Sequence, residues 1–481
     1  MMMMKKKMKT PHTFRALVPL AAALALSACS TFMPPTQVEV ETPAQWQAPL
    51  PHQGSVGSLT QWWDQQGDPL LVELIAAAQA VSPSISQALS RVEASRAQQA
   101  AARAALLPNL NAQYAASRGV SQPNFPVTTT QQIGLQSAWE IDVVGANRAV
   151  SRAALANVQG TQAQWHDARV SVAAEVANLY YSLSTCQLQL ALAQRDAASR
   201  QETARLTEIN AKAGFLAPSL GAMARASAAD GNSRLTQQRA LCDLDTKALV
   251  ALTAIPEPDL KAKLTAVPVK PAQAAPISVA SVPAQTIAQR PDVFSAERDV
   301  MVASAQVGNA KAQRLPRLSL NGSIAGTRLT TDGVDQNGTT WSFGPLAISL
   351  PLFDAGQRAA AVTASEANYA AVVSTYRGKV RQAVREVEEA LVNLNSTEAR
   401  TQDAIVSTRG YAESLAATQS RFGQGLASLV ELEDARRNAL ASESSQLTLA
   451  LERNRAWVAL YRALGGGFEP DTVTNKTAAA N

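Results

Sequence analysis

The sequence predicts an α+β membrane protein in which long coiled-coil helices continue from a β-barrel that several copies of the chain build together. Two observations support this prediction. The 481-residue chain repeats one order of elements, namely a helix, two strands, a long helix and a shorter return helix, at an offset of about 210 residues. Each repeat also contains a run of about 67 residues without proline, which would be about 100 Å long as one continuous helix.

Matched motifs define the two repeats. Leu107-Pro108 in the first repeat corresponds to Leu315-Pro316 in the second, and Glu257-Pro258 corresponds to Glu469-Pro470. These landmarks predict an internal two-fold sequence repeat, with repeat 1 over residues 67–258, a linker over 259–283 and repeat 2 over 284–470. Residues 471–481 form a polar tail that we expect to be disordered, because it has too few apolar side chains to pack.

Alternating apolar and polar side chains predict two strands in each repeat. The expected strands are Leu110–Ala116, Ile133–Asp142, Leu318–Ile324 and Trp341–Phe353, the last with a kink at Gly344-Pro345. This alternation fits a membrane strand as well as an amphipathic hairpin on a soluble core. Four strands cannot close a membrane barrel, since the smallest ordinary ones need about eight. A membrane barrel therefore requires several chains to contribute strands.

The long runs favour the membrane interpretation because they carry heptad seams. Apolar residues follow each other at spacings of four and three in Arg148–Ala213 and in Gln357–Gln424, as in a coiled coil. The seam residues are Val172, Val176, Leu179, Leu183, Cys186 and Leu190, and Val380, Val384, Val387, Leu391 and Leu394. Each run ends at a glycine-containing turn, and return helices are predicted at about Ser219–Ala254 and Ser428–Leu464.

Residues 1–28 have the features of a secretion signal, with a basic start, an apolar stretch and small residues before Cys29. The site Leu26-Ser27-Ala28-Cys29 resembles a bacterial lipobox. The resemblance implies that Cys29 becomes the lipidated first residue of a segment over 29–66, with this covalent lipid as the only non-protein group. Ser30, in place of aspartate, implies retention in the outer membrane. The alternative is an ordinary signal peptide beside a chance cysteine.

Charge and composition argue against several classes of protein. Five of the 43 basic residues precede residue 29, and without them basic and acidic residues are equal at 38 each, so we predict no nucleic-acid binding. The three histidines are too few for a His-based metal cluster, and no spacing singles out a catalytic triad. The glycine cluster Gly465–Gly467 follows a helix and indicates a helix stop, not a phosphate loop. We expect no enzyme activity, no metal and no cofactor.

Together these features resemble the TolC-like outer-membrane factor family, in its lipoprotein (NodT-type) branch that serves RND multidrug efflux pumps. The motifs that carry the resemblance, besides the lipobox and Leu107-Pro108, are Trp62-Trp63, Asp68-Pro69-Leu70, Trp139–Asp142, Ala177–Tyr181, Arg290–Val293 with Ala296-Glu297, Pro351–Gly356 and Leu460–Gly467. The resemblance implies a homotrimer with a twelve-stranded outer-membrane barrel, four strands per chain, and a periplasmic α-helical barrel. It also implies a passive exit duct for small toxic compounds. The expected partners are a periplasmic membrane-fusion adaptor, an inner-membrane RND transporter and outer-membrane lipid.

Three other functions stay open. A type I protein-secretion duct has the same architecture. A heavy-metal efflux duct is possible, but the remaining histidines and the methionines are not clustered in a way that supports it. From a different class, a structural trimeric envelope spacer or adhesin would lack paired membrane hairpins at matched positions of two repeats.

The family resemblance places a periplasmic gate at the second turn, with Phe422, Val430, Asp434 and Arg437 as its residues. Val430, Asp434 and Arg437 are spaced by four and three, so they share one helix face. Three-fold symmetry would repeat Asp434 around a ring that attracts cations. The first repeat has no acid at the corresponding positions, 220–222. The alternative is a solvated charged tip, made of Glu431, Glu433, Asp434, Arg436 and Arg437.

Two cysteines form a candidate disulfide. Cys186 lies in the heptad seam, and Cys242 lies on the return helix, seven residues from Leu235 and from Leu249. Counted from a turn near Leu216, the two positions differ by only about 6 Å along an antiparallel pair. An oxidising periplasm would favour the bond. The alternative is two small, buried side chains with free thiols.

Overall fold

The computed structural model describes residues 33–50, 61–120, 126–266, 277 and 283–469. The predicted signal, Cys29 and the predicted tail lie outside the described residues. Contacts divide the chain into two compact units. The first unit comprises Met1–Glu39, Arg91–Thr161 and Ser295–Arg377, and the second comprises Val40–Ser90, Gln162–Phe294 and Gly378–Asn481.

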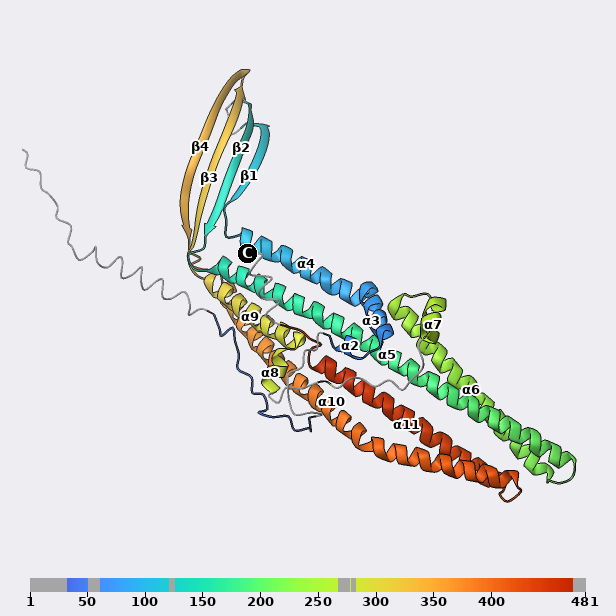
Figure 1. The fold of residues 1–481 in the computed structure, drawn as a ribbon. Coiled ribbons are helices and arrows are strands. Elements are labelled where there is room, and N and C mark those ends of the chain that lie inside the picture. Colours follow the sequence, from blue (N-terminus) through green and yellow to red (C-terminus); the bar gives the residue numbers. More distant parts are fainter. Residues whose placement is uncertain (1–32, 51–60, 121–125, 267–276, 278–282, 470–481) are drawn as a thin grey trace, which may run out of the picture. The chain divides into compact units, whose positions relative to one another are not determined.

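The same order of elements occurs in both halves of the chain (Figure 1). In the first half the elements are α4 (Pro83–Ala104), β1 (Asn109–Gly119), β2 (Thr128–Ile141), α5 (Ala146–Lys212) and α6 (Pro218–Thr253). In the second half they are α9 (Pro291–Ala312), β3 (Arg317–Thr331), β4 (Val334–Ser349), α10 (Gln357–Gly423) and α11 (Leu429–Ala463). The described residues also contain four shorter helices, α2 (Trp62–Gln65), α3 (Pro69–Val81), α7 (Glu257–Ala266) and α8 (Pro283–Ala288).

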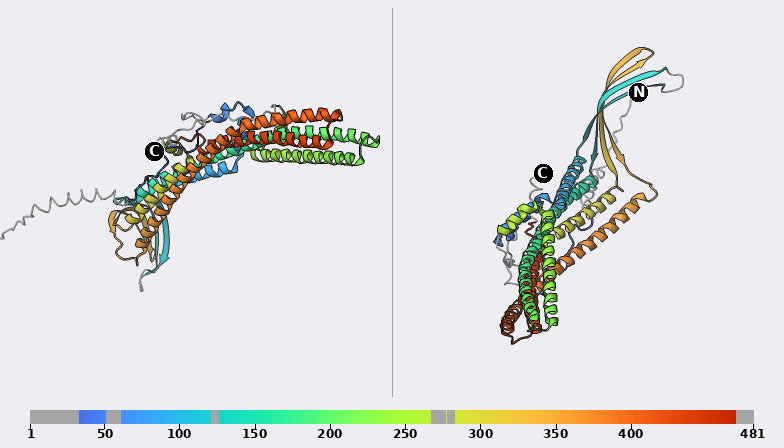
Figure 2. Two further views of the ribbon diagram at one scale, coloured as in Figure 1. Left: turned by 90° about the horizontal axis from the view of Figure 1, so that it is seen from below. Right: turned by 90° about the vertical axis from the view of Figure 1, so that its right-hand side faces the viewer.

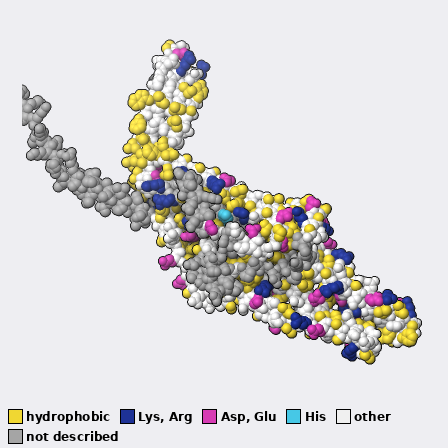
Figure 3. Space-filling view, viewed as in Figure 1, with side chains coloured by type: hydrophobic (Ala, Val, Ile, Leu, Met, Phe, Trp, Pro, Cys, Tyr) yellow, Lys and Arg dark blue, Asp and Glu magenta, His cyan; other side chains and the backbone are white. Residues whose placement is uncertain are grey.

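The first unit contains an antiparallel sheet of four strands in the order β1-β2-β3-β4. Its central pair, β2 and β3, joins segments far apart in the sequence, with Trp139 opposite Leu320 and Ile141 opposite Leu318. Among the described residues the edge strands β1 and β4 each pair with one neighbour only. Hydrophobic side chains cover much of the visible face of the sheet (Figure 3). Those of β4, such as Trp341 and Phe343, are among the most exposed in the chain.

The fourth strand differs from its prediction at both ends. It begins at Val334, because Asp332-Gly333 forms a two-residue hairpin turn with positive φ at both positions. Residues 334–340 are mostly polar, so alternation could not reveal this part of the strand. The strand ends at Ser349, ahead of Pro351, and not at Phe353. The predicted kink at Gly344-Pro345 lies opposite a shift in register between Leu320 and Gly322.

The second unit is built on four helices that run side by side, from α5, α6, α10 and α11 (Figure 2). Their contact surfaces contain most of the predicted seam. The buried seam residues are Val172, Val176, Leu183 and Cys186 of α5, and Val380, Val387, Leu391 and Leu394 of α10. Burial of these seam residues stabilises the long segments as helices.

Four helices in the described residues lie where none was expected, namely α2, α3, α7 and α8. α3 begins after Asp68, whose carboxylate accepts hydrogen bonds from the amides of Leu70 (3.1 Å) and Leu71 (3.2 Å). α7 occupies residues 259–266 of the predicted linker, and its Leu260 is fully buried. That part of the linker is thus packed helix. No single helix in the described ranges is long and apolar enough to cross a membrane. Taken together, α3 and α4, which are joined at a bend of 52°, have the length and composition of a membrane span.

The chain after α11 turns back onto the second unit through three glycines. A side chain at Gly465 would collide with the carbonyl oxygen of Gln289 and lie 3.1 Å from Cα of Arg290. Beyond the glycines, the Phe468 ring packs on that of Phe294, with the ring centroids 5.5 Å apart. The cluster that the sequence marks as a helix stop is therefore also a site of close backbone approach.

We expect Gly465→Ala to lower the free energy of unfolding by about 2–4 kcal/mol, because the new methyl group meets backbone atoms that cannot move aside. Guanidinium denaturation of the detergent-solubilised protein, followed by circular dichroism, measures the change. Gly410→Ala is the matched control. Gly410 lies inside α10, where an added Cβ would have no atom within 4 Å, so this change should stabilise by up to about 1 kcal/mol. Equal effects of the two substitutions would contradict the prediction.

Candidate functional site

The turn between α10 and α11 is held by a reciprocal cap. The Ser428 hydroxyl accepts a hydrogen bond from the amide of Glu431 (3.2 Å), and the Glu431 carboxylate accepts one from the amide of Ser428 (2.6 Å). These bonds lower the pKa of the Glu431 carboxyl. The turn between α5 and α6 lacks such a cap, since α6 starts at Pro218 after Ala217, which has no capping side chain. The two turns are therefore stabilised by different means.

Three of the four predicted gate residues lie on one face of α11. Val430, Asp434 and Arg437 are all exposed, and Asp434 forms an ion pair with Arg437. Phe422 does not belong to this face. It is partly buried against an apolar cluster that includes Leu429. The structure thus brings together the residues whose spacing predicts a shared face, while Phe422 packs between helices.

A groove of about 590 Å³ runs between α6 and α11 of the second unit, and the three exposed gate residues line it. Its charged residues are Arg200, Arg234 and Arg437, and Asp230, Glu433 and Asp434. Asp230 comes from the return helix of the first half, although the sequence comparison found no acid there at the corresponding turn. Both hairpins therefore contribute carboxylates to the groove.

A buried ion network, which the sequence did not reveal, fixes α11 to α5. Arg200 of α5 forms ion pairs with Asp196, at 2.9 Å, and with Glu433 of α11. Its stem lies beside Gly231 of α6, where an added Cβ would come within 3.0 Å of Arg200 Cδ. The Ser227 hydroxyl of α6 donates to Glu433 at 2.8 Å. Three helices therefore meet at one buried guanidinium.

Arg436 extends this network on its far side. It is only 5% exposed, and it bonds Glu433 at 2.9 Å and the hydroxyls of Thr203 (2.7 Å) and Ser199 (3.0 Å). Burial lowers the pKa of the Arg436 guanidinium, with Arg200 acting in the same direction and Glu433 opposing it. Arg436 is thus buried and Glu433 is partly buried between two guanidinium groups, so the alternative of a wholly solvated tip is wrong for these two residues.

The arrangement has a clear electrostatic consequence. The groove holds basic and acidic side chains in equal number, and the acid proposed for the gate already has a basic partner on its own helix. The electrostatic field of the Asp434 carboxylate is therefore partly cancelled within the chain. The described residues include no group of three or more His, Cys, Asp or Glu that could hold a metal ion.

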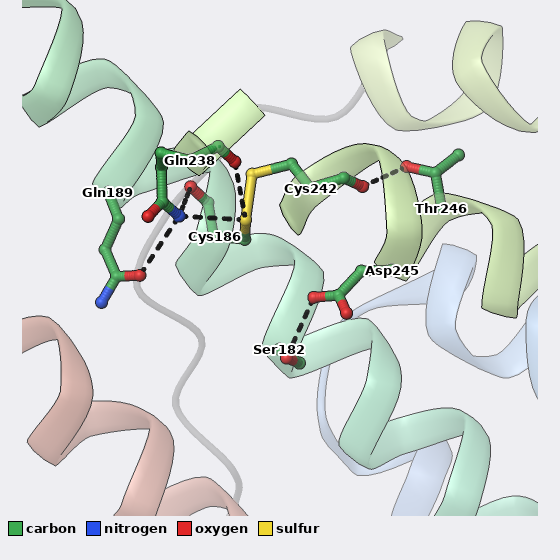
Figure 4. Close-up of a disulfide and its surroundings, with 7 residues drawn as sticks. All are labelled: Ser182, Cys186, Gln189, Gln238, Cys242, Asp245 and Thr246. Carbon is green, nitrogen blue, oxygen red and sulfur yellow. Dashed lines mark hydrogen bonds between the residues drawn. A yellow bond between two sulfur atoms is a disulfide. The ribbon is translucent and has the colours of Figure 1, made fainter. Parts of the chain in front are cut away.

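A disulfide joins α5 and α6 between Cys186 and Cys242, with their Cα atoms 5.6 Å apart (Figure 4). Polar contacts surround it. The Gln238 side chain donates to the carbonyl of Cys186 at 3.4 Å, and Ser182 donates to Asp245 at 3.0 Å. The hairpin of the first half thus carries a covalent cross-link between its two helices.

Comparison with known proteins identifies the family. The profile of the family described as outer membrane efflux protein matches residues 74–254 and 282–466. The toluene efflux pump outer membrane protein TtgI of Pseudomonas putida is 28% identical over 476 residues, which cover 95% of this chain and 98% of TtgI. Nodulation protein T of Rhizobium leguminosarum bv. viciae is 27% identical over 475 residues, which cover 96% of each chain.

A solved structure agrees with this assignment. The outer-membrane channel OprN superimposes with a TM-score of 0.77 at 25% sequence identity, covering 89% of this chain and 98% of OprN. The chain belongs to the outer membrane efflux protein family. It is an efflux protein of the outer membrane with a large periplasmic portion.

We expect Asp434→Ala to raise channel conductance in planar bilayers and to weaken its preference for cations. The substitution removes the carboxylate and leaves Arg437 without its ion-pair partner. Arg437→Ala is the matched control, and it should shift the reversal potential in the opposite direction. Wild-type conductance and selectivity in a well-folded Asp434→Ala channel would show that the constriction lies elsewhere.

We expect mass mapping without reduction to recover one cross-linked species that contains Cys186 and Cys242. The bond closes a loop with a sequence separation of 56, so its reduction should lower the free energy of unfolding by about 4 kcal/mol. Cys242→Ser should cause the same loss and should make the protein insensitive to reductant. Alkylation of both thiols in unreduced protein would contradict the prediction.

Proposed function

We propose that three copies of this chain form the outer-membrane exit duct of a tripartite efflux pump, which carries drugs and other small toxic compounds from the periplasm to the exterior. The observation that carries the proposal is a sheet whose two edge strands, β1 and β4, have no second partner within the described chain. An open edge leaves a row of backbone donors and acceptors unpaired. Edge-to-edge joining of three sheets gives one closed sheet of twelve strands.

The strands suit a lipid environment. They are 11, 14, 15 and 16 residues long, whereas a membrane strand needs about 9–11. In a single chain the sheet exposes large apolar side chains to solvent, among them Leu110, Tyr114, Ile133 and Ile348. Lipid contact would remove them from water.

The helical part then forms the periplasmic tunnel. Each chain contributes the α5–α6 and α10–α11 hairpins, and the turns of both hairpins form the end that meets a periplasmic membrane-fusion adaptor and, through it, an inner-membrane RND transporter. TtgI, by its name a toluene efflux pump component, supports this placement by similarity. The exposed face of Val430, Asp434 and Arg437 lines the constriction at this end.

The duct is passive, so it requires no cofactor and performs no catalysis. Energy comes from the transporter in the inner membrane. The single covalent addition is a lipid on Cys29, which retains the mature chain in the outer membrane with several acyl chains. The two halves of the chain are copies of one unit, as supported by their common order of elements and by the two separate stretches that the family profile matches.

We expect deletion of the gene to increase sensitivity to several unrelated drugs and dyes, and complementation to restore resistance. Native mass spectrometry of the purified protein should give the mass of three chains, each carrying acyl groups on its first residue. Unchanged drug sensitivity together with loss of a secreted protein would favour a type I secretion duct instead. Unchanged sensitivity and secretion, with altered surface adhesion, would favour a structural spacer or adhesin.

A further inference from the structure

The two helical hairpins of the second unit are packed by equivalent contacts. In the α5–α6 hairpin, a Cβ added at Gly231 would lie 3.4 Å from Cα of Ala197. In the α10–α11 hairpin, the Thr408 hydroxyl donates a hydrogen bond to the carbonyl of Ser442 at 3.3 Å. Thr408 lies 211 positions after Ala197, and Ser442 lies 211 positions after Gly231. One offset therefore relates α5 to α10 and α6 to α11 in space as well as in sequence.

Within one chain, α5 also packs on α11, and charged residues form much of this contact. Arg195 of α5 forms an ion pair with Glu443 of α11 at 2.5 Å. Arg200 of α5 forms another with Glu433 of α11. We call the contact made by these four residues the internal joint, because it joins the two halves of one chain.

The offset gives each residue of the internal joint a counterpart. The counterparts of α5 residues lie on α10, and those of α11 residues lie on α6. Arg195, Arg200, Glu433 and Glu443 correspond in this order to Val406, Tyr411, Ala222 and Asn232. Four charged side chains are thus replaced by four uncharged ones.

The counterparts lie open in a single chain. Val406 is 61% exposed and Tyr411 is 44% exposed, and Ala222 and Asn232 are exposed as well. Arg200 of the internal joint is buried instead. The equivalent helix faces are therefore covered at one place and uncovered at the other. A second copy of this chain carries both uncovered faces, so it can cover them in the way that the internal joint does.

A hydrogen bond beside the internal joint has a counterpart too. Arg436 of α11 is buried and donates to the Thr203 hydroxyl of α5 at 2.7 Å. Its counterpart Arg225 is exposed in a single chain, and the counterpart of Thr203 is Ser414, an exposed residue with a hydroxyl group. A donor and an acceptor are thus both available for the equivalent bond between two copies.

The sheet of the first unit gives the same result through its register. Near the start of β1 and the end of β2, the hairpin registers relate β1 to β3 by 208 positions and β2 to β4 by 211. Ser137 of β2 pairs with Gly322 of β3. Transferred by these offsets, Ile348 of β4 lies opposite Tyr114 of β1 in the next copy. Both side chains are large, apolar and exposed in a single chain, so the transfer places apolar residues together.

We propose that neighbouring copies are joined by a counterpart of the internal joint that lacks its ion pairs, in which Val406 and Tyr411 of α10 pack on Asn232 and Ala222 of α6 in the next copy. We call this contact the copy joint. The inference rests on the assembly of three copies in the proposed function. Each copy offers one α10 face and one α6 face, so three copies close a ring. Because the copy joint lacks the ion pairs, salt should weaken it less than the exposed ion pair of the internal joint.

Cysteine pairs test the geometry of the copy joint in the full-length membrane protein. Val406→Cys with Asn232→Cys, treated with a short bismaleimide, should give covalent species of two and three chains on denaturing gels. Val406→Cys with Leu244→Cys is the matched control. Leu244 is also exposed, but it lies 12 residues, or about 18 Å, further along α6, so this pair should stay monomeric. Arg195→Cys with Glu443→Cys should cross-link within one chain only.

Charge grafting tests the chemistry of the copy joint. Val406→Arg with Asn232→Glu copies the ion pair of the internal joint into it, and Val406→Arg with Asn232→Arg opposes two like charges there. We expect the like-charge pair to lower the temperature at which trimers dissociate by several degrees, and the opposite-charge pair to restore it at low salt. High salt should remove this restoration and leave the wild type almost unchanged. Circular dichroism of each variant controls for folding.

The outcomes separate the copy joint from the trimer itself. Equal cross-linking of the Asn232 and Leu244 pairs, or equal dissociation temperatures of the like-charge and opposite-charge variants, would overturn the copy joint. Trimers that show no cross-link between positions 406 and 232 would also overturn it, while the exit duct of the proposed function would stand. Single chains in native mass spectrometry of the wild type would refute the trimer and with it the copy joint.

Discussion

The buried seams of α5 and α10 are the interaction on which the other features depend. A helix of 67 residues is stable in a protein because one of its faces is covered, and its intrinsic propensity contributes less. Val176 and Leu183 of α5, and Val387 and Leu391 of α10, supply that covered face and are almost fully shielded from water. These helices position the turns, the groove and the ion network.

The two helical hairpins are stabilised by different interactions. The α5–α6 hairpin is joined by a covalent bond, and its turn has no side-chain cap. In the α10–α11 hairpin, the first turns of α11 carry a reciprocal cap and an ion network in which Glu433 is shared by two guanidinium groups. Buried charges are stable only when each has its partners, so this second arrangement depends on the neighbouring helix in a way that the first does not.

The sequence predicts the long helices and the return helices closely, because each carries a clear period or a clear stop, and it finds part of every strand. It misses the hairpin-proximal ends of three strands, namely residues 128–132 of β2, 325–331 of β3 and 334–340 of β4, which are rich in polar residues or glycine. It also misses the four shorter helices α2, α3, α7 and α8. For the candidate site, spacing identifies the shared face of Val430, Asp434 and Arg437. Spacing along one helix cannot identify which residues of a neighbouring helix contact it. For this reason the partner of Glu433 on α5 and the packing of Phe422 become visible only in the fold.

The glycine turn after α11 has a consequence for how the chain is made. Phe468 covers Phe294 and Ala163, so a segment that follows α11 completes a core whose other members stand 174 and 305 positions earlier in the chain. Because a chain exported from its N-terminus delivers Phe468 after these residues, the core cannot close until the segment beyond α11 has been exported as well. The Phe294 ring therefore stays uncovered during that interval.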